Sequence, residues 1–169
     1  MGKSAVARRL RPAWNTVEVA DLARRTGTAR PHRGGVEVDL SRLRRALGVP
    51  GALDGVDVIV GHLAHFLPVR EAIVLRCHPR ELARRLQRAR RGTAADREEN
   101  LVCEALDLVA SEAADIGLSV YEVDTTGTGV RAVAEEVGRR LRRGGRPRRG
   151  VVDWLADRTV TAHLLETTA

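Results

Sequence analysis

The sequence predicts an α/β protein in which parallel strands are covered by helices, and two observations lead to this prediction. Short apolar runs that suit strands alternate along the chain with longer segments of helical periodicity. Only 2% of the residues are aromatic although 43% are hydrophobic, so the core must consist mainly of Val, Leu, Ala and Ile. These residues dominate buried parallel strands. The length of 169 residues corresponds to about one domain.

The expected strands lie in residues 14–19, 56–60, 72–77 and 119–123, with a minor extended segment in residues 36–40. Residues 14–19 alternate between apolar and polar side chains, whereas residues 56–60 form an apolar run too short for a buried helix. Helices are expected in residues 4–11, 20–25, 41–47, 79–91, 96–114 and 130–141, with a short one from residue 151. Residues 26–35 are rich in Gly, Arg, Pro and Thr and predict a loop.

Parallel strands joined by right-handed crossovers place their carboxyl ends at one edge, where ligands of such sheets bind. The side chains expected at this edge are those of His62, Cys77, His78 and residues 124–126.

The chain begins with Met1-Gly2-Lys3-Ser4, and Lys3 is the only lysine among its 29 basic residues. A Gly-Lys-Ser triplet that leads into a helix is typical of the end of a phosphate-binding loop, where backbone N–H groups and a helix N-terminus face an anion. The lysine would reach the β- and γ-phosphates, and the serine hydroxyl would hold Mg²⁺. The alternative interpretation of so short a motif is a solvated N-terminus.

Charge favours polyanionic partners such as nucleotides or RNA, because the net charge is +7 and the isoelectric point about 10.9. Residues 139–149 contain seven arginines and no acid. This run fits a contact with RNA phosphates and a solvated helix end with a flexible linker equally well. The low aromatic content argues against stacking on single-stranded bases as the main mode of binding.

Cys77 and Cys103 lie in apolar surroundings without the spacing of metal ligands, so both are predicted to be reduced core residues. We expect no metal site built from His and Cys, and expect His65 and His78 to be structural or solvated. No apolar run approaches the ~20 residues of a membrane span. The chain is therefore expected to be cytoplasmic, without a membrane partner.

Several stretches resemble one family and occur along the chain in the family's order. They are GKS (2–4), VADLAR (19–24), GHLAHFLP (61–68), VLR (74–76), EN with Glu104 (99–104), EVDTT (122–126) and GVVDWL (150–155). They are similar to the archaeal and eukaryotic adenylate kinases that also act as assembly factors of the small ribosomal subunit. The resemblance spans nearly the whole chain.

The resemblance implies a P-loop nucleoside monophosphate kinase of three layers around a five-stranded parallel sheet. The implied reaction is transfer of the terminal phosphate of ATP to AMP or a related monophosphate, with Mg²⁺ as cofactor and with ATPase activity. The implied partner is the small ribosomal subunit, through its rRNA or a ribosomal protein, during rRNA processing and subunit maturation. Residues 1–143 would form the kinase domain, and residues 144–169 a linker and a short helical extension.

The resemblance also implies that the central first strand and the first part of the phosphate-binding loop are missing from the chain, and that the true start lies upstream of Met1. Without that strand, two strand edges would lack partners, and each buried backbone group left unsatisfied costs about 1–3 kcal/mol. We expect poor ATP affinity for the chain as it stands.

Individual roles follow from the resemblance position by position. The ATP phosphates would contact Gly2, Lys3, Ser4 and Ala5, with Ser4 acting through Mg²⁺. The monophosphate would contact Arg24 in a binding segment that covers about residues 17–39. A mobile lid would cover about residues 90–100 and bring Arg91 to ATP. The implied catalytic residues are Lys3 and His62.

One position departs from the family pattern. The acidic residue of an acidic-x-His motif falls at Val60, and Asp57 lies too early to point at the same site. Mg²⁺ handling is therefore in question. The alternative function is a non-catalytic, basic RNA- or ribosome-binding assembly factor with a crippled nucleotide site.

Overall fold

The protein is described by a computed structural model that covers residues 2–32, 35–89 and 93–167. The helices are α1 (Lys3–Leu10), α2 (Val19–Arg25), α3 (Leu40–Leu47), α4 (Pro79–Arg88), α5 (Ala94–Ala105), α6 (Leu108–Asp115), α7 (Val130–Arg143) and α8 (Arg158–Thr167). Short 3₁₀ turns occur at η1 (Ala64–Phe66) and η2 (Trp154–Ala156). The strands are β1 (Thr16–Glu18), β2 (Ala29–His32), β3 (Gly35–Val38), β4 (Val58–Val60), β5 (Glu71–Arg76) and β6 (Ser119–Asp124).

The parallel strands form two separate pairs. β1 pairs with β4 in the register Glu18 to Val60, and β5 pairs with β6 in the register Arg76 to Asp124. Among the described residues no strand joins β4 to β5. The mixed α/β class with parallel pairing is confirmed, whereas the strands expected in a single sheet are divided between two pairs.

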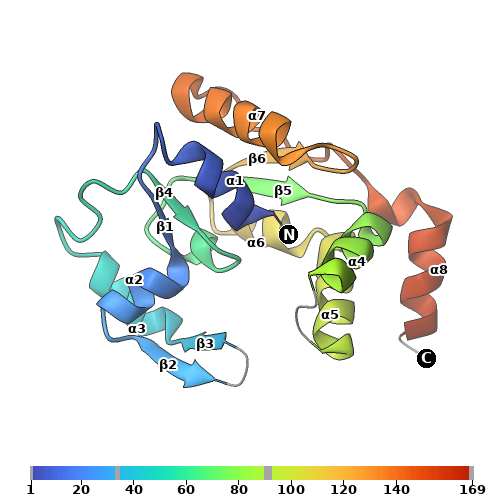
Figure 1. Ribbon diagram of the computed structural model, residues 1–169, viewed down its shortest axis with the longest axis horizontal. Helices are drawn as coiled ribbons and strands as arrows, with labels where there is room; N and C mark the ends of the chain where they lie inside the picture. Colours follow the sequence, from blue (N-terminus) through green and yellow to red (C-terminus); the bar gives the residue numbers. More distant parts are fainter. Residues whose placement is uncertain (1, 33–34, 90–92, 168–169) are drawn as a thin grey trace.

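Helices cover both faces of the β5–β6 pair, as expected for three layers. On one face, α1 and α7 bury Val6, Leu10, Val133 and Val137 in one cluster with Val123 of β6. On the other face, α6 packs Ala110 and Ala113 against Val120 of β6. Figure 1 shows this order, with α7 above and α6 below the two strands.

Two further clusters flank these layers. One joins β1, α2 and α3 through Val17, Leu22 and Leu43, and the other joins α4 to α5 through Leu82, Leu86 and Leu101. In Figure 1 the start of α1 lies between the elements of the first cluster and those of the second.

The loop predicted for residues 26–35 is wrong in part. β2 pairs with β3 as an antiparallel hairpin, with Ala29 opposite Val38 and Arg30 opposite Glu37. Turn-forming composition masked a strand here because the pairing that stabilises β2 comes from β3 and not from its own apolar pattern.

The prediction of a single helix over residues 96–114 is also wrong, because the helix is interrupted between α5 and α6. Asp107 adopts a left-handed conformation with φ of 55°, and its carboxylate lies 2.7 Å from Arg76 Nη1. α5 itself begins as a capping box, in which Thr93 and Asp96 each accept a backbone hydrogen bond from the other.

The segment that follows α7 is joined to β6 by backbone hydrogen bonds. Arg148 pairs with the edge of β6, where its N–H donates to Val120 O (2.9 Å) and its carbonyl accepts from Glu122 N (2.8 Å). No helix in the described part of the chain is long and apolar enough to span a bilayer.

Candidate phosphate-binding site

The N-terminus of α1 has the features of an anion site. Gly2 caps the helix in a left-handed conformation with φ of 117°, and a Cβ placed there would meet no atom within 4 Å. No side chain caps the helix, and its first turn, which starts at Lys3, contains no acidic residue. The first N–H groups of a helix have no partner within the helix, so they can face a phosphate.

Lys3 is solvent-exposed, although enough protein lies around its ammonium group to desolvate it. Desolvation lowers the pKa of Lys3, and the carboxylates of Glu104 and Glu18 oppose this shift. The two carboxylates favour the charged form of Lys3, the form that can pair with an incoming phosphate, whereas desolvation favours the neutral form.

His62 lies in the same neighbourhood. Its pKa is lowered first by desolvation, then by the charge of Lys3 and then by His65. Its position depends on Gly61, because a Cβ at that position would lie 2.7 Å from Val19 Cγ2 at the start of α2. The charge of Lys3 acts on His62, so the two residues predicted to be catalytic lie within electrostatic range of each other.

Of the other residues predicted to bind nucleotide, only Ser4 and Ala5 lie on α1 with Lys3. Ser4 and Ala5 follow Lys3 in the first turn of α1. Arg24 is exposed on α2, where it pairs with Asp21 at 2.6 Å. Arg91 lies outside the described residues, as does the start of the predicted lid.

Two carboxylates to which the sequence patterns assigned no role, those of Glu18 and Glu104, act electrostatically on Lys3. Glu18 ends β1 and is the register partner of Val60, the position where an acid was expected. Asp57 directly precedes β4, at the end opposite to Val60, and its carboxylate accepts from Asn15 N at 2.7 Å. The position of Glu18 at the end of a strand could have marked it as a candidate site residue. Its alignment with Val60, however, depends on the pairing of β1 with β4, which the sequence does not show.

Glu104 is the second of these carboxylates. Its Oε1 atom accepts hydrogen bonds from Arg76 Nε (2.9 Å) and Cys77 N (3.1 Å), and also from Trp154 Nε1 (3.1 Å). It therefore connects the end of β5 to the C-terminal segment, and its charge acts on Lys3.

His65 and His78 have structural roles, and the two cysteines form no disulfide. His65 is buried, and its Nε2 lies 3.1 Å from Glu112 Oε2. His78 caps α4, since its Nδ1 accepts from Arg80 N at 3.2 Å. Cys77 is buried and Cys103 partly buried, and both are free thiols. Within the described residues, no group of three or more His, Cys, Asp or Glu side chains could hold a metal ion.

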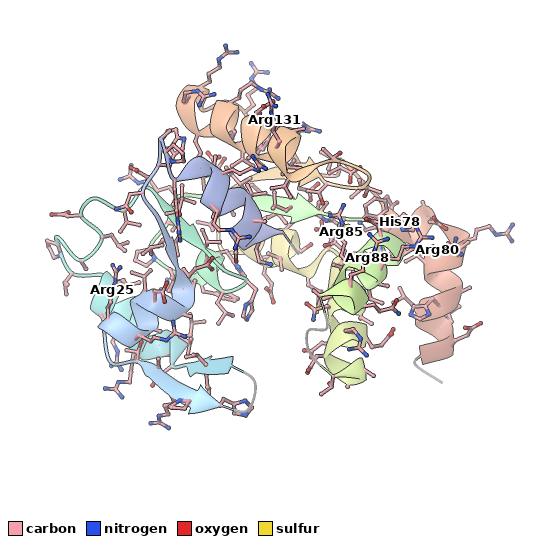
Figure 2. All side chains as sticks on the ribbon, in the orientation of Figure 1. Arg25, His78, Arg80, Arg85, Arg88 and Arg131 are labelled. Atoms are coloured by element: carbon pink, nitrogen blue, oxygen red, sulfur yellow. The ribbon has the colours of Figure 1, made fainter. Side chains whose placement is uncertain are left out.

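The loop after β6 is fixed by α4. Arg85 donates to Thr125 O at 2.9 Å, and Thr126 Oγ1 accepts from His78 N at 2.9 Å. Figure 2 shows His78 and Arg85 together with Arg80 and Arg88 at α4, whereas Arg25 lies on the other side of the start of α1. The carboxyl ends of β5 and β6 thus form a rigid border of the candidate site.

The donor set fits ATP with Mg²⁺ better than Mg²⁺ alone. Backbone N–H groups and one ammonium suit phosphates, and the Ser4 hydroxyl suits Mg²⁺. Mg²⁺ commonly takes most of its ligands from water and substrate phosphates and only one or two from carboxylates. Glu18 is a carboxylate available on the same edge.

Comparison with known proteins agrees with this geometry. No family model matches the chain. Proteins named "Putative adenylate kinase" match over most of the sequence: that of Thermococcus onnurineus is 36% identical, covering 90% of this chain and 85% of its own. The one from Archaeoglobus fulgidus is 35% identical, covering 92% and 87%.

The chain belongs to this adenylate kinase-like family. A third member, from Methanothermobacter thermautotrophicus, is 37% identical, with 80% of each chain covered. Such similarity along the chain supports the P-loop, adenylate kinase-like fold for the two parallel pairs and their helices.

Proposed function

We propose that the protein is a nucleoside monophosphate kinase that transfers the terminal phosphate of ATP to AMP or a related monophosphate. The observation that carries the proposal is the position of Lys3, the only lysine of the chain, at an open helix N-terminus beside His62. Phosphoryl transfer depends mainly on positioning and on neutralising charge, so a single well-placed ammonium has a large effect.

Each residue has a defined task in this proposal. Backbone N–H groups of α1 and the Lys3 ammonium bind the ATP phosphates, and Gly2 allows the backbone to approach them. Ser4 holds Mg²⁺, which neutralises charge on the transferred group when bound. His62, whose pKa is lowered so that the neutral ring is favoured, orients water or Mg²⁺-bound groups as a hydrogen-bonding partner. Arg24 binds the monophosphate, and Arg91 reaches ATP from the lid.

The deciding experiment is a coupled assay of ADP formation from ATP with AMP, dAMP, CMP or no acceptor. Lys3→Ala is expected to lower kcat/KM by a factor on the order of 10²–10³, because it removes the ammonium group that would neutralise charge on the ATP phosphates. Arg8→Ala, an exposed change one turn further along α1, is the matched control and should stay within about twofold. Equal activity of the Lys3→Ala protein and the wild type would refute the proposal. We also propose that the protein has ATPase activity, and the assay without acceptor tests it.

We further propose that the kinase acts in rRNA processing and maturation of the small ribosomal subunit, in the cytoplasm. A second candidate function, a non-catalytic RNA- or ribosome-binding factor, is favoured by Val60 at the expected acidic position. Binding to small-subunit RNA that survives Lys3→Ala, in a protein without phosphoryl transfer, would favour this second function.

A further inference from the structure

The segment of residues 150–157 crosses the carboxyl end of β5 and contacts three different elements. Val151 N donates to Glu122 Oε2 of β6 at 3.0 Å. Trp154 Nε1 donates to Glu104 Oε1 of α5 at 3.1 Å. Asp157 Oδ2 lies 3.0 Å from Nε2 of His78, the residue that caps α4. The segment therefore ties together the elements that border the candidate phosphate site.

The indole of Trp154 completes the set of donors on one carboxylate oxygen. Oε1 of Glu104 accepts from Trp154 and also from Arg76 Nε and Cys77 N, at 2.9 and 3.1 Å. The Glu104 side chain is 15% exposed. A partly buried carboxylate with several N–H donors has a well-defined orientation, and each hydrogen bond to such a charged group is stronger than one between neutral groups.

Trp154 also contacts the His78 ring edge-on, with centroids 5.0 Å apart. Nδ1 of His78 accepts from Arg80 N, which assigns the proton to Nε2 and makes this nitrogen the donor to Asp157. The backbone N–H of His78 donates to Thr126 Oγ1 in the loop after β6. The C-terminal segment thereby fixes a residue that itself holds this loop.

Glu104, which the indole orients at the end of β5, lies within electrostatic range of Lys3 at the start of α1, and its charge opposes the effect of desolvation on the Lys3 pKa. The same oxygen that binds the indole thus belongs to a group that contributes to the electrostatics at the phosphate site. In Figure 1 the connection before α8 crosses beside α4, the helix that follows β5.

We propose that Trp154 is a positioning residue of the nucleotide site: its indole N–H holds the Glu104 carboxylate at the end of β5, next to Lys3. The inference rests on the proposed phosphate site at Lys3. It assigns the C-terminal extension a part in ATP binding.

The first test is the substitution Trp154→Phe, which removes the N–H and keeps an aromatic ring against His78. The chain offers a matched control in Trp14→Phe, since Trp14 Nε1 is enclosed and has no hydrogen-bond partner among the described residues. We expect kcat/KM for ATP to fall about tenfold in Trp154→Phe, mainly through KM, and to change less than twofold in Trp14→Phe. Equal values for the two variants would overturn the inference.

The second test needs no activity and no nucleotide. Because Lys3 is the only lysine, a protein labelled with ¹³C-lysine gives one ε-methylene signal from this site. At constant pH this signal should shift in the same direction in Trp154→Phe and in Glu104→Gln, and should not move in Trp14→Phe. An unmoved signal in a Trp154→Phe protein with wild-type circular dichroism would overturn the inference.

A third measurement uses the wild type and remains decisive if Trp154→Phe does not fold. Addition of ATP should shift the indole N–H resonance of Trp154 and leave that of Trp14 in place. If calorimetry detects ATP binding but the Trp154 resonance does not shift, the inference is overturned and the proposed function is not. A wild type that binds no ATP would instead refute the proposed function, and the lysine signal would still decide whether Trp154 positions Glu104 beside Lys3.

Discussion

Asp107 is a residue whose ionised form destabilises the folded state, and the adjacent sequence does not predict this effect. It adopts a left-handed backbone conformation and lies 2.7 Å from Arg76 Nη1, in an arrangement that lacks hydrogen-bond geometry. Desolvation outweighs the attraction of Arg76 and raises the pKa of Asp107 to about 6. The ionised form is therefore disfavoured in the folded protein.

This predicts a pH-dependent effect of Asp107→Asn. A carboxyl whose folded pKa of about 6 exceeds the unfolded value of 3.8 stabilises the fold below pH 3.8 and loses this contribution as pH rises through 6. Asparagine tolerates the left-handed conformation and cannot ionise, so the variant should be more stable than the wild type by about 1–2 kcal/mol at pH 8. Urea unfolding at pH 4 and pH 8 measures the difference, which should vanish at pH 4.

Asp54→Asn is the control for this prediction, because Asp54 is exposed in a loop. A constant difference between Asp107→Asn and the wild type at both pH values would contradict it.

At the scale of elements, the end of β5 depends on Arg76, which is 2% exposed. Its guanidinium lies within 3.1 Å of Glu104, Asp107 and the fully buried Glu122. One cation thus joins α5, the turn before α6, and β6. Removal of the cation would leave buried carboxylates without their counter-charge.

We therefore expect Arg76→Met to lower the free energy of unfolding by about 3–5 kcal/mol, the usual cost of breaking a buried ion pair from one side. Arg24→Met, which breaks an exposed pair with Asp21, should cost less than about 1 kcal/mol. Chemical denaturation of both variants tests this contrast. Similar decreases in the free energy of unfolding would show that the Arg76 cluster stabilises the fold no more than the exposed pair does.

The pairing of β1 with β4 leads to a prediction about Mg²⁺. Glu18 lies in register with Val60, where the family pattern has an acid, and its charge acts on Lys3. If Glu18 supplies the carboxylate of this edge, Glu18→Gln should raise the Mg²⁺ concentration for half-maximal kinase activity severalfold. Glu37→Gln, on exposed β3, is the control and should leave the Mg²⁺ dependence unchanged. The same Mg²⁺ dependence in both variants would exclude this role of Glu18.

At the scale of the whole molecule, the arginine-rich run of residues 139–149 divides into two groups. Arg140 is buried, donates from Nε and Nη2 to Glu71 at 2.8 and 2.9 Å, and stacks over Tyr121. Arg148 pairs with Glu136. Other arginines of the run are exposed, among them Arg139, Arg142 and Arg143. The interpretations as RNA contact and as solvated surface therefore apply only to the second group.

This division predicts different effects for two sets of substitutions. Arg140→Gln should destabilise the fold, because it leaves Glu71 without its bidentate partner. Changing Arg139, Arg142 and Arg143 together to Gln should preserve stability. If these residues contact RNA, the change should also flatten the salt dependence of binding to small-subunit RNA, by up to about 0.7–0.9 per lost phosphate contact in log K against log salt. Unchanged affinity and slope would identify this surface as solvated.

Local patterns predicted much of the fold, because apolar runs and caps depend on near neighbours. The strands around residues 16–18, 58–60, 71–76 and 119–124 and the helix after Pro79 follow from such patterns. The β2–β3 hairpin and the break at Asp107 do not, since strand pairing stabilises the first and an ion pair with Arg76 accompanies the second.

By itself, the sequence determined the α/β class and singled out Lys3, since a lone lysine before a helix is visible without any structure. Only the tertiary structure decided that the parallel strands form two pairs and that Lys3, His62, Glu18 and Glu104 share one neighbourhood. It also brought Trp154 to Glu104, across fifty positions of the chain. The physical reason is that periodicity acts between adjacent turns, whereas charge and hydrogen bonding act between any groups that packing brings together.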